Sequence, residues 1–156
     1  MIPLLTSPFD RVSLQHTRPA ARGGLADWEH SAEGALALIL LFDQFPRNMF
    51  RGNARAFATD AMARAVAERA LVRGYDHATD STMRSFFYLP LMHSEALVDQ
   101  DRCIRLYEAL CDAEQLRYAR EHREVIEKFG RFPRRNRALS RETTRAERAF
   151  LDDVAD

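Results

Sequence analysis

Apolar positions recur along this chain at the three- and four-residue spacing of helices, and no segment shows the strict alternation of a surface strand. The most apolar run, residues 35–42, is apolar on nearly every side, which predicts a buried central helix capped by Ser31. A buried strand is the alternative for so short a run. We prefer a helix because the run is rich in alanine and leucine and the chain offers no second strand to pair with it. We therefore expect 35–42 to be the most buried segment.

Capping residues, prolines and glycines place the other elements. Ser7, Pro8 and Asp10 predict a short first helix, and the capping box of Thr144 and Glu147 predicts the start of the last one. The central helix is expected to end at Pro46 and to be followed by a loop over 47–53. Further helices are expected from Thr59 or Asp60 to Gly74, over 82–88, over 99–111, over 114–129 and from the capping box to about 154. Pro90 is expected either to break the helix over 82–88 or to form the first turn of a new segment.

Short connections between these helices predict that successive helices pack antiparallel. The fold class we expect is all-α, an antiparallel array of about 6–8 helices. A length of 156 residues suits one domain, 1–156, with no room for two of ordinary size.

Three strings, LALILLFDQFPRNMFRG, YLPLMHSE and EKFGRFPRRN, together resemble a bacterial family known as domain of unknown function 924. The resemblance covers roughly residues 9–152 and implies a tetratricopeptide-like helical protein, with no established activity. Members of that family usually begin with a further helical segment that contains a Phe-Trp-Phe-like run, and we expect that segment to be absent here.

Composition and charge narrow the function classes. The chain is 46% apolar and 29% charged with zero formal net charge, so no global field favours nucleic acid or an anionic membrane. Cys103 and Cys111 would lie roughly 12 Å apart along one helix, beyond the limit of about 7 Å for a disulfide. We expect two free thiols and a cytoplasmic protein, because no apolar run is long enough to be a signal sequence or to cross a bilayer.

The first candidate ligand-binding cluster follows the central helix and comprises Asp43, Gln44, Arg47, Asn48 and Arg51. Polar groups at the end of a very apolar helix suggest a pocket floor, where arginines could grip a carboxylate or phosphate. The alternative is that these side chains bond the last helix carbonyls.

The second candidate cluster repeats the Phe-Pro-Arg pattern of the first in Arg131, Arg134, Arg135 and Asn136. It belongs to the one strongly basic stretch of the chain, which could hold an anionic ligand. Nucleic acid is poorly supported as a partner, because Phe132 is the only aromatic residue in this stretch. A solvated basic loop is the alternative.

Candidate catalytic residues are His93, Glu95, His122 and Asp43. A histidine beside a carboxylate can act as a general base, although no metal-binding spacing is present, so we predict no metal and no cofactor. His122 shares a helix face with Tyr118, Ile126 and Phe129; it is either a hydrogen-bonded core residue or a buried base opposite His93.

Two functions remain open. One is a helical binding module for a peptide or protein partner, which rests on the fold analogy alone. The other is an enzyme or binder of a small anionic ligand, in a pocket between the two Phe-Pro-Arg loops. The second function requires Arg47, Asn48, Arg134 or Arg135, and Asn136 to converge with His93 on one site.

Overall fold

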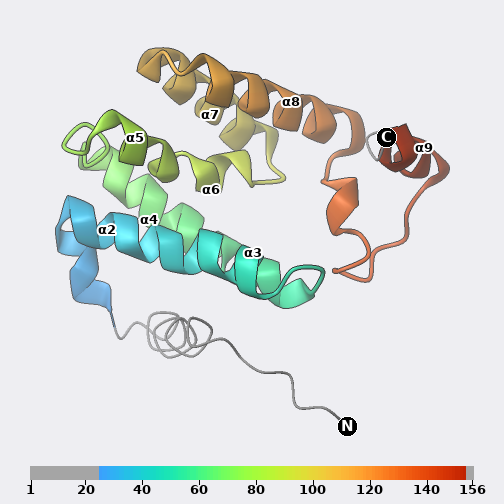
Figure 1. Cartoon of the computed structure of the whole chain (residues 1–156), viewed down its shortest axis with the longest axis horizontal. Coiled ribbons are helices and arrows are strands. Elements are labelled where there is room, and N and C mark those ends of the chain that lie inside the picture. Colours follow the sequence, from blue (N-terminus) through green and yellow to red (C-terminus); the bar gives the residue numbers. More distant parts are fainter. Residues whose placement is uncertain (1–24, 154–156) are drawn as a thin grey trace, which may run out of the picture. The chain divides into compact units, whose positions relative to one another are not determined.

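The computed structural model describes residues 25–153, and within that range every regular element is helical and no strand is present (Figure 1). The all-α prediction is confirmed. The chain divides into two compact units, of which the first contains residues 25–51 and 55–87 and the second contains 52–54 and 88–153. The helix predicted from Ser7 lies outside the described residues.

The first unit is built on one long helical path and a second helix packed against it. Its elements are η1 (Ala26–His30), α2 (Ala32–Ile39), the π-helical turn η2 (Leu40–Gln44), α3 (Phe45–Met49), η3 (Ala54–Phe57), α4 (Asp60–Val72), α5 (Ser81–Arg84) and η4 (Ser85–Phe87). The Ser31 hydroxyl accepts a hydrogen bond from the N–H of Gly34 at 3.1 Å, which confirms the predicted cap.

The core of this unit lies between α2 and α4. Leu38, Ile39 and Phe42 are buried, as are four small residues on one side of α4, namely Ala63, Val66, Ala67 and Ala70. Small side chains let the two helix backbones approach closely, so that the larger side chains of α2 fill the space between them. Residues 35–42 are largely buried, but 87–94 contains as many buried residues, so the expectation that 35–42 is the most buried segment is not met.

The prediction that the central helix ends at Pro46 is wrong, because the helical path continues to Met49. A proline inside a helix leaves the carbonyl four residues earlier without its donor, and its ring crowds that carbonyl. Here the N–H of Phe45 bonds the carbonyl of Leu40, five residues back, and this wider turn gives the ring room. The carbonyl that Pro46 would leave without a donor is that of Phe42, and it accepts a hydrogen bond from the Thr59 hydroxyl.

The second unit contains α6 (Leu89–Met92), α7 (Leu97–Leu110), α8 (Ala113–Phe129), η5 (Pro133–Arg135) and α9 (Arg145–Asp153). The helices α7 and α8 pack side by side across a tight turn (Figure 1). In that turn Cys111 adopts a left-handed conformation with φ of 56°, and Asp112 caps α8 by accepting from the N–H of Gln115. Cys103 and Cys111 are free thiols, as predicted.

The boundaries of α8 and of its terminator, Gly130, agree with the prediction. The helix predicted over 82–88 is instead two short pieces, α5 and η4, and Pro90 lies in the first turn of a new helix, α6. Within 25–153, no helix combines the length and apolarity needed to span a membrane.

Candidate functional site

The first predicted cluster lies at the junction of η2 and α3 in the first unit. Asp43 is 1% exposed, and its Oδ1 accepts two hydrogen bonds from the Arg47 guanidinium, from Nε at 3.1 Å and from Nη2 at 3.0 Å. The same Nη2 donates to Asp60 on α4 at 2.8 Å. Arg47 therefore joins the end of the long helical path to the start of α4.

The remaining members of this cluster bond one another and the helix end. The amide of Asn48 donates to the Gln44 carbonyl at 3.0 Å, and Arg51 donates to the Asn48 side chain at 3.1 Å. The Gln44 amide lies 2.5 Å from the second carboxylate oxygen of Asp43. These contacts agree with the alternative interpretation of the sequence, in which the polar side chains bond the last carbonyls of the helix.

The second predicted cluster is organised around a buried carboxylate, Glu147. Arg131 donates to both of its oxygens, at 2.6 and 2.9 Å, and to the carbonyl of Glu142. The Thr144 N–H donates to the Glu147 carboxylate and the Glu147 N–H donates to the Thr144 hydroxyl, which confirms the predicted capping box. The Arg131 guanidinium and the Thr144 N–H lower the pKa of Glu147 to about 2. Asn136 is buried nearby.

The segment that carries His93 and Glu95 is fixed by its own hydrogen bonds. The buried amide of Gln100 donates to the carbonyls of Met92 and Ser94. The carboxylate of Glu95 accepts two hydrogen bonds from Arg141, both at 2.9 Å, and one from the N–H of Phe132. Burial raises the pKa of Glu95, but these donors outweigh it and hold the pKa below its ordinary value. Glu95 is therefore held in its ionised form by Arg141 and the N–H of Phe132.

Arg135 links this segment to η5. Its Nη2 donates to the His93 carbonyl at 2.7 Å, and its guanidinium lies over the ring of Phe132, 4.6 Å from the centroid. The structure thus brings three predicted residues of the second unit, His93, Glu95 and Arg135, around Phe132. Arg134, next to Arg135, is exposed.

His122 stands on α8 with its ring edge against Phe132, at 5.5 Å between centroids and 71° between planes. Its Nδ1 lies 2.8 Å from the carbonyl oxygen of Tyr118. Burial lowers the pKa of His122, the contact with the Tyr118 carbonyl raises it in part, and the electrostatic effects of His93 and Arg135 lower it further. Both histidines of the predicted pair therefore lie within one unit and influence each other electrostatically.

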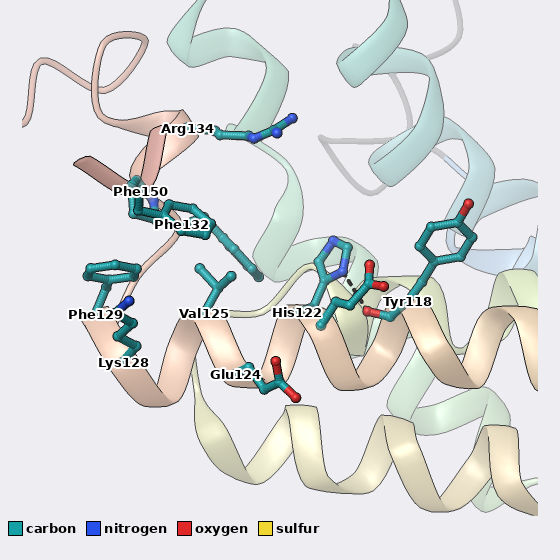
Figure 2. Close-up of a pocket in the computed structure, with 11 residues that line it drawn as sticks. Tyr118, His122, Glu124, Val125, Lys128, Phe129, Phe132, Arg134 and Phe150 are labelled. Carbon is teal, nitrogen blue, oxygen red and sulfur yellow. Dashed lines mark hydrogen bonds between the residues drawn. The ribbon is translucent and has the colours of Figure 1, made fainter. Parts of the chain in front are cut away.

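Beside His122 the surface opens into a groove of about 640 Å³, which we call the α8 groove (Figure 2). It is bounded by α8, η5 and α9, and its lining is mostly apolar. The lining residues are Tyr118, Glu121, His122, Glu124, Val125, Lys128, Phe129, Phe132, Pro133, Arg134 and Phe150.

Only part of this groove was predicted from the sequence. Ile126 was expected on the face of His122, but Ile126 is buried and Val125 lines the groove instead. The spacing of Tyr118, His122, Val125 and Phe129, at i, i+4, i+7 and i+11, is the signal that could have identified the stripe. Phe150, which lies 5.2 Å from Phe129 between ring centroids, comes from α9 and had no such signal.

Among residues 25–153, no group of three or more histidine, cysteine or acidic side chains is placed to hold a metal ion. The carboxylates of Glu95 and Glu147 are held ionised by arginines, and His122 is the histidine that lines the groove. Binding is therefore better supported by this arrangement than proton transfer between paired groups.

The predicted convergence of the two Phe-Pro-Arg loops stays a prediction. Arg47 and Asn48 belong to the first unit, whereas His93, Arg135 and Asn136 belong to the second. Within the second unit, Arg135 of the second Phe-Pro-Arg loop donates a hydrogen bond to the carbonyl of His93, directly after α6.

Comparisons with known proteins identify relatives but no activity. Residues 6–154 match a family described as bacterial protein of unknown function (DUF924). The chain is also similar to the structure of a protein of unknown function from Agrobacterium tumefaciens, with 47% sequence identity and a TM-score of 0.86. The match covers 89% of this chain and 78% of the other. No curated protein matches the chain.

Proposed function

Because the chain belongs to the bacterial family of unknown function DUF924, we propose its function from geometry: it is a binding module whose α8 groove takes a peptide segment of a protein partner. The observation that carries this proposal is the apolar floor of the groove. Tyr118 is exposed and Val125, Phe129 and Phe150 are partly exposed, although the other face of α8 is packed in the unit.

The dimensions of the floor suit a short peptide. Tyr118 and Phe129 are eleven residues apart on α8, which corresponds to about 16 Å along the helix axis. That length matches about five residues of extended chain or three turns of a helix. Burying one leucine- or phenylalanine-sized side chain contributes about 1.5–3 kcal/mol, so apolar anchors on this floor would supply much of the binding free energy.

Charges of both signs border the floor and favour a peptide over a purely apolar ligand. Glu121 and Glu124 lie on the lining together with Lys128 and Arg134. In Figure 2, Arg134 extends above the floor on the side opposite α8. Polar groups at the edge of an apolar centre are typical of protein-recognition surfaces.

A small anionic ligand is less well supported as the occupant. Of the second-cluster arginines, Arg131 is held by Glu147 and Arg135 by the His93 carbonyl. Arg141 is likewise held by Glu95. An anion that used these guanidinium groups would have to replace charge-assisted hydrogen bonds that hold the fold.

The test is a selection of 12-residue peptides from a random displayed library on the purified protein, followed by fluorescence polarisation with the enriched peptides. Val125→Glu places a charge on the groove floor and should weaken their binding at least tenfold. Val98→Glu, on α7, makes the same change at a residue that is 71% exposed and outside the groove, and should leave binding within twofold. Equal binding by both variants, with circular dichroism showing both folded, would contradict the proposal.

A further inference from the structure

The contact with Tyr118 determines which ring nitrogen of His122 carries the proton. A carbonyl oxygen only accepts hydrogen bonds, so the Nδ1 that lies 2.8 Å from it carries the proton. Burial lowers the pKa below the ordinary value, so the ring is neutral at pH 7 and Nε2 carries a lone pair.

This Nε2 is turned toward the groove. Figure 2 shows the ring standing off α8, with the second nitrogen directed away from the helix backbone. Among residues 25–153, the hydrogen bond that this ring makes is the one at Nδ1. The charged groups that act on the ring are Glu121 on its own helix, His93 at the end of α6 and Arg135 on η5. A fixed acceptor therefore sits in an otherwise apolar lining.

The surroundings of Nε2 favour an aromatic ring. Phe132 meets His122 edge-on from one side, and the inclined pair of Phe129 and Phe150 continues the aromatic wall. Aromatic rings prefer such tilted and edge-to-face neighbours. A ligand ring seated against this wall brings its own polar edge within reach of His122.

We propose that the α8 groove selects an aromatic side chain that carries a hydrogen-bond donor, with His122 Nε2 as the acceptor that determines this specificity. Tryptophan and tyrosine supply that chemistry, through the indole N–H and the phenolic O–H, whereas phenylalanine does not. The inference rests on the proposed function, because it identifies the anchor residue of the bound peptide. A site built around one polar partner discriminates mainly against ligands that leave that partner unpaired.

The experiment uses two matched pairs of probes that differ only in the donor. One pair is N-acetyl-tryptophanamide and its 1-methyl-indole form, and the other is N-acetyl-tyrosinamide and its O-methyl form. Each is titrated into ¹⁵N-labelled protein at pH 7.5, and the dissociation constant is taken from the amide shifts of Val125 and Phe129. At least one donor-bearing probe should bind about three- to tenfold more tightly than its methylated partner, the range for one neutral hydrogen bond.

His122→Phe keeps an aromatic ring but removes the acceptor. In this variant the preference for the donor-bearing probe should fall to within about twofold, the level of no hydrogen bond. The comparison of probes on the unaltered chain needs no variant, so a folding defect in His122→Phe leaves the inference testable. Which pair shows the preference distinguishes tryptophan from tyrosine.

Equal binding of donor and methylated probes to the unaltered chain would overturn the inference and leave the peptide-binding function standing. The absence of any shift at Val125 and Phe129 would overturn it as well. In that case the effect of Val125→Glu on library-selected peptides decides separately whether the groove binds peptides at all.

Discussion

The hydroxyl of Thr59 lies 2.5 Å from the carbonyl oxygen of Phe42, seventeen residues earlier in the chain. This is the carbonyl that Pro46, with no N–H, cannot bond. The contact joins the residue before α4 to the π-helical turn, next to the point where Arg47 bridges Asp43 and Asp60. Thr59 therefore allows the long helical path of the first unit to run through a proline.

Removing that hydroxyl should destabilise the protein. Thr59→Val keeps the shape of the side chain but leaves the buried Phe42 carbonyl without this donor, which costs about 1–3 kcal/mol. Urea unfolding followed by circular dichroism measures the change. Thr82→Val, at an exposed position on α5, is the matched control and should change the free energy of unfolding by less than about 0.5 kcal/mol. Equal effects of the two substitutions would show that the contact contributes nothing.

Replacing Gly34 by alanine should destabilise the protein, the opposite of the usual effect of this substitution in a helix. Replacing a helical glycine by alanine ordinarily stabilises by about 1 kcal/mol. Here a Cβ on Gly34 would lie 2.1 Å from the backbone carbonyl oxygen of Trp28, so η1 would have to move away from α2. Gly34→Ala should therefore lower the melting temperature. A raised melting temperature would mean that η1 is free to shift at no cost.

Glu147 should make stability depend on pH in the acid range. Its pKa is about 2 in the folded chain, well below the ordinary value of 4.5, so the folded state favours the ionised form. A group with a lowered folded pKa stabilises fully above its unfolded pKa and loses that contribution as the pH falls from about 4.5 toward 2. Melting temperatures of the wild-type chain and of Glu147→Gln should therefore differ most above pH 5 and converge on acidification. A difference that stays constant from pH 7 to pH 3 would contradict the assignment.

The two cysteines should differ sharply in reactivity. Cys103 is fully buried, and burial raises the pKa of its thiol to about 12, whereas Cys111 is exposed. Because the thiolate is the reactive form, a thiol reagent should modify one group in the native chain and two in denaturant. Cys111→Ser should abolish the native reaction and leave one group in denaturant. A native count of two would show that the core around Cys103 opens readily.

The elements that could be predicted from the sequence are those whose ends are encoded locally. The helix α8 begins after Asp112 and ends at Gly130, and its capping residues lie within three positions of the backbone groups they satisfy. The capping box of α9 is equally local. The continuation through Pro46 could not be predicted, because the donor that compensates for the missing N–H comes from Thr59, beyond the following loop.

The sequence also could not show which of two neighbouring residues lines the α8 groove. Val125 and Ile126 are neighbours on α8 and equally apolar, and only the packing of α7 and α6 decides which of them is covered. Arg131 was identified from the repeated Phe-Pro-Arg pattern, but its acidic partner, Glu147, lies 16 residues away. Spacing shows that such groups are present, whereas the fold determines whether they serve a ligand or one another.

Cys111, in its left-handed turn between α7 and α8, also provides a natural attachment site for a fluorescent label. A fluorophore attached there needs no engineered cysteine and no removal of Cys103, whose thiol is shielded. Because the turn precedes α8 by one residue and the groove begins near Tyr118, the dye would sit about two helical turns from the nearest bound ligand. Energy transfer from that position to a labelled peptide would reveal in which direction the peptide chain runs along α8.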